Sequence, residues 1–302
     1  ASAFWALFLL LAVVAGQAQG VPFELYVAGN NTISQLDTDG NVVATAPTDN
    51  GGRGMRIMGD VFYTAFQGGA HRQGVTTVDY SWPPSPTYET AFRTLDADPT
   101  RIYDDPRDMV TGPDDALYII STNMAKGVVR YDPVSGALSR FIDGSDWGTA
   151  RYLAVGPDAT GNGQPDFYVG NWATDLHEIR IYDGASGAYV RNLVDTATNG
   201  GLNRPHGMAF QTEGGHPYLY VASLLNDRVK KYDGSTGAFI EDYYRASWVK
   251  PGETSTFRTY GLTFDDAGYM YVGTNNGIYR VDPGGGTASG EHFSRVGKDH
   301  MM

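Results

Sequence analysis

Residues 217–245 read PYLYVASLLNDRVKKYDGSTGAFIEDYYR. Two short runs rich in aromatic and aliphatic residues, YLYVAS and RVKKY, flank the turn-forming pair Asn226 and Asp227. A second turn, DGSTG, leads into a third run, AFIEDYY. Short runs of this composition between turn residues are typical of β-strands joined as hairpins. The segment therefore predicts three successive antiparallel strands.

The same pattern recurs along the whole chain. A short strand closing on Asp returns about every 50 residues. Its six copies are ISQLD, VTTVD, VVRYD, IRIYD, VKKYD and IYRVD, ending at Asp37, Asp79, Asp132, Asp183, Asp233 and Asp282. An earlier strand of each later unit carries an apolar column made of Met55, Met109, Leu153, Met208 and Leu262. Four strands per unit in six units predict an all-β, six-bladed β-propeller of four-stranded antiparallel blades.

The repeated Asp residues themselves are best explained by turn chemistry. Each stands at the start of a reversal such as DPVSG or DGASG, where an Asp carboxylate accepts backbone N–H groups two residues further on. We therefore expect these six residues to be structural.

Composition excludes several functional classes. The chain of 302 residues has 22 basic and 34 acidic residues, a net charge of −12, and no cysteine. Without cysteine it has no disulfide scaffold and no thiolate chemistry. The negative charge opposes the phosphate neutralisation on which nucleic-acid binding depends. The 39 glycines agree with many short strands and tight turns.

The first twenty residues are predicted to lie outside the propeller. An apolar run at 4–15 precedes small residues, with Gly16 and Ala18 at positions −3 and −1 of a cleavage site. The run is shorter than the roughly 20 residues that span a bilayer. Residues 1–18 are therefore interpreted as a signal peptide, and we expect a secreted or extracellular protein, or a periplasmic one, without stable membrane insertion.

Residues 23–302 are then expected to form the propeller. The first unit lacks an innermost strand of its own. His300 and Met302 repeat the spacing of His206 and Met208, which predicts that residues 299–302 begin the strand that closes the first blade and that the chain is truncated there. The alternative is an unstructured tail.

Three segments, GPDDALYIIS, NDRVKKYDGSTGAFIEDYY and RPHGMAFQTEGGHPYLYVAS, resemble NHL-type repeats. The resemblance covers about residues 23–296 and is weakest in the second unit, where the segments 68–74 and 81–86 interrupt the pattern. It implies a six-bladed propeller of a family that includes scaffolds, ligand-binding domains, lyases and lactonases. It identifies a fold more firmly than a function.

One repeat position predicts a binding site. In a propeller, the residue two places before the apolar column enters the innermost strand at one rim, where loops between the second and third strands also gather. We expect this rim to bind a small anionic or carbohydrate ligand, or a protein partner. Its predicted residues are Arg53, Arg107, Arg151, His206 and Tyr260, with Trp147, Trp172 and Trp248. Alternatively, the Arg residues pair with Asp104, Asp105 and Asp108, and the Trp residues fill gaps between blades.

One loop has the spacing of a calcium site. Its oxygen ligands would be Asp158, Thr160, Asn162, Gln164 through its carbonyl, and Asp166. The spacing resembles the calcium loops of FG-GAP repeats, but acidic residues are absent at the third, fifth and twelfth positions. Ca²⁺ is thus the one candidate cofactor, and an ordinary hairpin loop is the alternative.

Catalytic signals are weaker. His206 is the best general-base candidate, with His177 as a second, because a histidine titrates near neutral pH. No Gly-x-Ser-x-Gly nucleophile motif is present. The sequence favours a binding module over an enzyme. The alternative is a lyase- or lactonase-like enzyme with a metal in the central channel, which would require His206, His177 and a carboxylate to converge.

Overall fold

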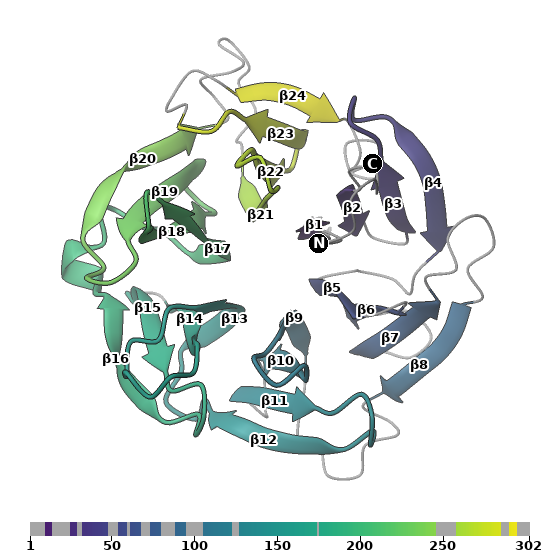
Figure 1. The fold of residues 1–302 in the computed structure, drawn as a ribbon, viewed down its shortest axis with the longest axis horizontal. Helices are drawn as coiled ribbons and strands as arrows, with labels where there is room; N and C mark the ends of the chain where they lie inside the picture. The colour runs from purple at the N-terminus through teal and green to yellow at the C-terminus, as the bar shows by residue number, and fades with distance from the viewer. Residues whose placement is uncertain are drawn as a thin grey trace, which may run out of the picture.

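The protein is an all-β propeller, as the repeats predict. In the computed structural model, antiparallel sheets surround one central axis (Figure 1). The helical content of the described residues is one turn of 3-10 helix, η1 (Thr196–Thr198). The structure describes residues 10–13, 25–28, 32–47, 54–58, 61–67, 73–79, 88–94, 105–122, 127–173, 175–245, 258–284 and 290–294.

Five blades are each made of four strands that follow one another in the chain, numbered from the inside outward. The first is β5 (Gly54–Met58), β6 (Val61–Gln67), β7 (Gln73–Asp79) and β8 (Tyr88–Thr94). The next is β9 (Pro106–Thr111), β10 (Leu117–Ser121), β11 (Gly127–Tyr131) and β12 (Leu138–Asp143). It is followed by β13 (Thr149–Gly156), β14 (Asp166–Trp172), β15 (His177–Tyr182) and β16 (Tyr189–Val194). The fourth is β17 (Pro205–Glu213), β18 (His216–Ser223), β19 (Arg228–Asp233) and β20 (Phe239–Arg245). The fifth is β21 (Thr259–Phe264), β22 (Met270–Thr274), β23 (Gly277–Val281) and β24 (Gly290–Ser294).

A further four-stranded sheet consists of β1 (Leu10–Val13), β2 (Leu25–Ala28), β3 (Thr32–Leu36) and β4 (Val42–Pro47). Its innermost strand differs from the expectation. β1 comes from the apolar run at 4–15 and pairs with β2, with Leu10 opposite Ala28, whereas the expected strand at 299–302 lies outside the described residues. An inner propeller strand is covered on both faces, so it has the same unbroken apolar composition as a signal sequence. Hydropathy alone does not separate the two, and cleavage after Ala18 stays a prediction.

A repeated glycine contact joins neighbouring sheets. Gly187 and Gly237 lie in the turn after the repeated Asp with positive φ, and an added Cβ would lie 2.2 Å from the Phe141 carbonyl oxygen and 1.7 Å from that of Leu193, respectively. Gly40 has the same relation to Phe293 of β24, at 1.9 Å. Sheet β1–β4 therefore packs on blade β21–β24 in the way that blades β13–β16 and β17–β20 pack on their neighbours.

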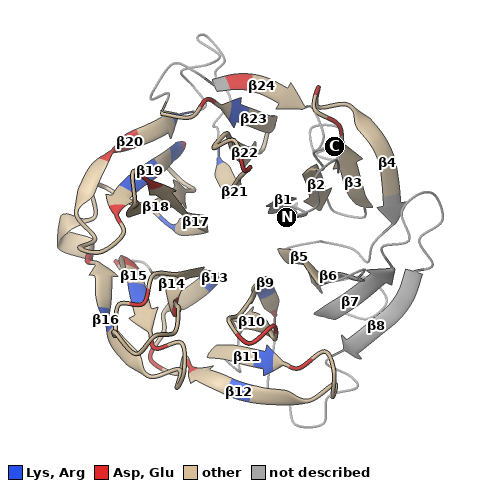
Figure 2. Ribbon diagram, viewed as in Figure 1, with Lys and Arg blue, Asp and Glu red and all other residues tan. Residues whose placement is uncertain are grey.

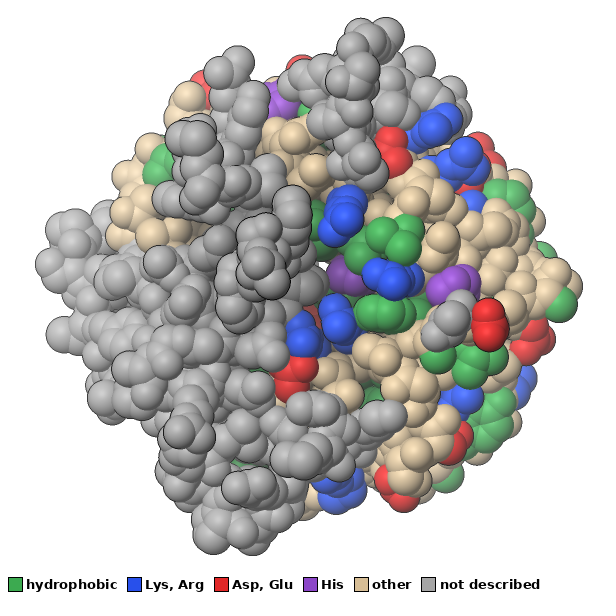
Figure 3. Space-filling view, turned by 180° about the vertical axis from the view of Figure 1, so that it is seen from behind, with side chains coloured by type: hydrophobic (Ala, Val, Ile, Leu, Met, Phe, Trp, Pro, Cys, Tyr) green, Lys and Arg blue, Asp and Glu red, His purple; other side chains and the backbone are tan. Residues whose placement is uncertain are grey.

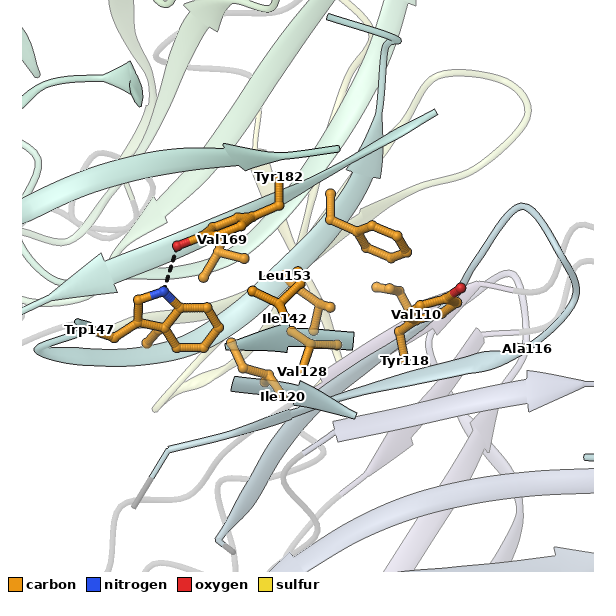
Figure 4. Packing of buried hydrophobic residues seen from close by; sticks show 12 residues of the cluster. Val110, Ala116, Tyr118, Ile120, Val128, Ile142, Trp147, Leu153, Val169 and Tyr182 are labelled. Carbon is orange, nitrogen blue, oxygen red and sulfur yellow. Dashed lines mark hydrogen bonds between the residues drawn. The ribbon is translucent and has the colours of Figure 1, made fainter. Parts of the chain in front are cut away.

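The core lies between blades. The apolar column predicted from the repeats is buried at all five positions. One cluster joins Val110, Tyr118 and Ile120 to Leu153 and Val169 of the next blade (Figure 4). These contacts fix the blades relative to one another and hold the inner strands around the axis.

The turn interpretation of the repeated Asp residues is confirmed where their hydrogen bonds are described. A carboxylate oxygen accepts backbone N–H groups within the turn at Asp37, Asp132, Asp183 and Asp233. For example, Oδ1 of Asp233 accepts from Ser235 at 3.0 Å and from Thr236 at 2.7 Å.

Candidate functional site

Four of the predicted rim residues share a backbone irregularity. The pairing of the first two strands shifts register at Arg107, Arg151, His206 and Tyr260, so each lies in a β-bulge at the start of its inner strand. Bulges re-aim side chains and recur next to functional sites. The repeat thus places one bulged residue in each of these four blades at the same end of the channel, whereas Arg53 and Trp248 lie outside the described residues.

Arg151, Trp172 and Arg204 form a stack at this end. The guanidinium carbon of Arg151 lies 4.7 Å from the centroid of the Trp172 ring, and that of Arg204 lies 4.6 Å from the same centroid. Cation–π contacts of this kind hold guanidinium groups at a fixed place on an indole. Seen from the opposite side to Figure 1, basic and histidine side chains border the described side of a hollow at the centre of the face (Figure 3).

His206 lies in an aromatic and cationic environment. Its ring is fully buried, 4.4 Å from the ring of Tyr152 and 5.9 Å from that of Tyr260. Burial, followed by the positive charges of Arg151, Arg204 and Arg258, lowers the pKa of His206 well below its usual value. The imidazole is therefore neutral at physiological pH.

Blade β9–β12 supplies an acidic residue, Asp105, at this end of the channel. Nε of Arg107 donates to Oδ2 of Asp105 at 2.9 Å, and the same oxygen accepts from the Thr122 hydroxyl at 3.1 Å. Arg107 and Asp105 are both buried. The alternative interpretation, a structural Arg–Asp pair, is therefore the better one for Arg107. Figure 2 shows how basic and acidic positions are distributed over the inner strands.

Two basic residues of the site were missed by the sequence analysis. Arg204 and Arg258 lie four places before Met208 and Leu262, in the repeat position that Asp105 occupies in its own blade. Arg204 and Asp105 both have positive φ, 58° and 52°, directly before a proline. The repeat alignment contains this second column, four places before the apolar residue.

His177 fixes the backbone of Arg204. Its Nδ1 accepts the Arg204 backbone N–H at 3.4 Å, and the Arg204 carbonyl accepts the N–H of Leu224 at 3.2 Å. Burial, and then the charge of Arg204, lowers the pKa of His177. The hairpins of two neighbouring blades thus hold Arg204 between them.

We call the residues gathered here the mouth cluster. It comprises Asp105, Arg107, Arg151, Trp172, His177, Arg204, His206, Arg258 and Tyr260. Within the described ranges, no carboxylate lies within ion-pair distance of Arg151, Arg204 or Arg258. Arg107 is thus neutralised by Asp105, whereas the other three guanidinium groups are not paired in this part of the chain.

Trp147 is not part of the mouth cluster. It packs in the core between blades β9–β12 and β13–β16, where its Nε1 donates to the Tyr182 hydroxyl at 2.6 Å (Figure 4). It fills a gap between blades, as the alternative interpretation expected, because its indole completes an apolar cluster there.

The calcium-like loop is closed by its own backbone. Asp158 accepts N–H groups from Thr160, Gly161, Asn162 and Gly163 at 2.6–3.3 Å. Asp166 is fully buried and accepts from Ala159, Thr160 and Gly184. Gln164 donates its backbone N–H to Oδ1 of Asn162. The Asp158 and Asp166 carboxylates thus accept backbone N–H groups, as they would in an ordinary hairpin loop, and calcium binding stays a prediction.

Two structural features are absent from the described residues. They contain no group of three or more His, Asp or Glu side chains arranged to hold a metal ion. They also contain no helix with the length and apolarity needed to cross a membrane.

Solved structures share the fold at low sequence identity. A chain from a nidogen/laminin complex superposes with a TM-score of 0.61 at 12% identity, covering 86% of this chain and 89% of that one. A gluconolactonase from Xanthomonas campestris gives 0.56 at 17%, covering 83% and 78%. An auxiliary nutrient binding protein from Bacteroides ovatus gives 0.56 at 12%, covering 83% and 63%. The chain is a β-propeller. No family model and no curated protein matches it, and these likenesses show the fold alone.

Proposed function

We propose that the chain is a secreted, six-bladed, NHL-like propeller that binds an anionic ligand or partner through the mouth cluster. Sheet β1–β4 counts as the sixth blade, because Gly40 packs on Phe293 in the way that Gly187 and Gly237 pack on their neighbouring blades. The observation that carries the binding function is the stack of Arg151 and Arg204 on Trp172 without a paired carboxylate.

The electrostatics support an anion rather than a neutral ligand. The whole chain has a net charge of −12, yet at His206 the positive charges of Arg151, Arg204 and Arg258 add to burial, the main cause, in lowering the pKa. A local positive field inside an acidic protein concentrates anions at that place. Nε of Arg151 and Nε1 of Trp172 are buried N–H groups without an acceptor among the described residues.

The structural neighbours agree with binding as one use of this fold. Two of the three solved structures above are a nidogen/laminin complex and an auxiliary nutrient binding protein. A protein partner with an acidic surface and an acidic saccharide both offer the chemistry that the mouth cluster would recognise.

A second candidate, a lyase- or lactonase-like enzyme, is favoured by buried ionisable groups on inner strands. His206 has a strongly lowered pKa, and burial raises the pKa of Asp108 to about 6 despite the charge of Arg56. Such displaced pKa values are common at active sites. Hydrolysis of gluconolactone, followed with and without added Zn²⁺, Mn²⁺ or Ca²⁺, tests this candidate. Turnover that disappears in His206→Gln would replace the binding proposal.

The binding proposal is tested by calorimetric titration with D-glucuronate and with D-glucose. We expect glucuronate to bind more tightly, and its affinity to fall between about 0.05 M and about 0.3 M NaCl as the Debye length shortens. Arg204→Gln removes one charged hydrogen-bond donor and should weaken binding by about tenfold. Arg140→Gln, which makes the same change on the outer strand β12, is the matched control. Equal affinity for the two sugars, or equal effects of the two variants, would contradict the proposal.

A further inference from the structure

We propose that the natural ligand of the mouth cluster carries at least two anionic groups. One binds at Arg151 and the other at Arg204, the two guanidinium groups that contact the Trp172 ring. This inference rests on the proposed anion-binding function and specifies its ligand class. The class is a molecule with two or more carboxylates or sulfates, either a small dicarboxylate or an acidic saccharide chain.

The first argument is the number of unpaired cations. Two guanidinium carbons lie within 4.7 Å of one indole centroid, and neither group is paired with a carboxylate in the described chain. Burial is the main cause that lowers the pKa of Arg151; the charge of Asp105 opposes it and the charge of Arg204 adds to it, so the two guanidinium groups repel each other. One anion relieves part of this repulsion, whereas two anionic groups on one ligand neutralise both cations.

The second argument is the contrast with Asp105. Arg204 and Asp105 occupy equivalent positions, each with positive φ before a proline. In one blade this position supplies an acid that neutralises Arg107. In the other it supplies a base beside a second base. Non-glycine residues with positive φ store strain and concentrate at functional sites. This repeat position can therefore hold an acidic residue that pairs with a neighbouring Arg, but in blade β17–β20 it holds Arg204.

The third argument is that Arg204 is held rather than free to turn away. Its N–H and carbonyl are bonded to His177 and Leu224 on the hairpins of two neighbouring blades. Its guanidinium rests on Trp172. Arg151 is held on the same ring by the β13 bulge. A fixed pair of cations favours a ligand whose anionic groups are themselves at a fixed separation, because little conformational entropy is then lost on binding.

The test compares ligands that differ in the number of carboxylates. Propionate is compared with glutarate, and galacturonate with digalacturonate, by calorimetry at matched ionic strength. We expect at least one dianion to bind about tenfold more tightly than its monoanion, as a second linked contact does. The advantage should be lost in both Arg151→Gln and Arg204→Gln and kept in Arg140→Gln. The pair that shows the larger advantage distinguishes a small dicarboxylate from a saccharide chain.

Two further measurements separate binding from folding. Arg151→Lys and Arg204→Lys keep the charge and should recover part of the affinity, while thermal melting reports whether any variant is unfolded. The NMR signal of the His206 ring gives a second readout. A bound dianion offsets the cations around it, so the ring should titrate at a higher pH with glutarate or digalacturonate than with the matched monoanion.

The outcomes distinguish the two proposals. If monoanions bind as tightly as dianions and both depend on Arg204, the anion-binding function stands and the dianion inference is wrong. If no carboxylate binds the wild-type protein, the proposed function is wrong and this inference falls with it. If the dianion advantage survives loss of either Arg, the two groups are not bound as stated and the inference is wrong.

Discussion

Trp147 and Tyr182 are joined by a hydrogen bond of 2.6 Å between Nε1 and the hydroxyl, with their ring centroids 5.9 Å apart. The two side chains belong to the cluster that seals blade β9–β12 against blade β13–β16. The bond lets a large indole lie in an apolar interface without leaving its N–H unsatisfied.

Trp147→Phe should therefore destabilise the protein without changing ligand binding. The variant loses buried ring atoms and the hydrogen bond from Trp147 to the Tyr182 hydroxyl, at a cost of about 2–4 kcal/mol. Urea denaturation measures the free energy of unfolding, and calorimetry measures glucuronate affinity. Trp172→Phe is the matched comparison and should do the opposite, lowering affinity more than stability. A fall in affinity with unchanged stability in Trp147→Phe would show that Trp147 belongs to the binding site.

The contact of His177 with the Arg204 backbone gives a second prediction. His177→Ala removes the acceptor that helps to hold Arg204 at its positive φ. We expect glucuronate affinity to fall by about threefold to tenfold, the range of one neutral hydrogen bond. Arg204 itself is retained, so the salt dependence of the residual binding should stay close to that of the wild type. Unchanged affinity would show that the Trp172 stack alone positions Arg204.

The sequence predicts the fold well because the repeat occurs six times. The Asp turn and the apolar column can therefore be recognised even where one copy departs from the pattern. Closure of the ring is different, because it depends on one strand. The leader residues around Leu10 satisfy the composition of an inner strand and of a signal sequence equally well.

The site was predicted in part for a related reason. The column containing Arg151 and His206 follows from repeat spacing alone. Whether an Arg is paired depends on neighbours in the next column or the next blade. Asp105 neutralises Arg107, whereas Arg204 joins Arg151 on Trp172. These contacts depend on side-chain positions across blades, which the spacing does not specify.

The loop around Asp158 gives a third prediction. Its carboxylate accepts four backbone N–H groups, and these bonds keep the pKa of Asp158 below its usual value. We expect neither added Ca²⁺ nor EDTA to shift the melting temperature. Asp158→Ala should lower the melting temperature, because it leaves turn N–H groups without their acceptor, whereas Asp158→Asn keeps one acceptor oxygen and should lower it less. A rise in melting temperature on adding Ca²⁺ that is absent in Asp158→Ala would show that this loop binds calcium.

Asp108 gives a prediction on pH. It is buried on β9, and its Oδ2 accepts the backbone N–H of Leu153 at 3.2 Å. Burial is the main cause that raises its pKa from 3.8 to about 6, against the opposing charge of Arg56. Below pH 4 the carboxyl is protonated in both the folded and the unfolded state. As the pH rises from 4 through 6, the unfolded state loses this proton first, so the contribution of Asp108 to stability falls.

The full loss above pH 6 is about 3 kcal/mol, since each pKa unit corresponds to about 1.4 kcal/mol. Asp108→Asn keeps an oxygen for the Leu153 N–H and never ionises. We expect the variant to match the wild type near pH 4 and to be more stable at pH 8, with the difference developing between pH 4 and pH 6. Urea denaturation across this range measures the difference. Asp132→Asn is the control, because turn hydrogen bonds lower the pKa of Asp132. This variant should become less stable than the wild type as the pH rises, the opposite of Asp108→Asn. If Asp108→Asn is instead less stable at pH 8, attraction to Arg56 outweighs the cost of burial, and Asp108 is an ionised partner of that guanidinium.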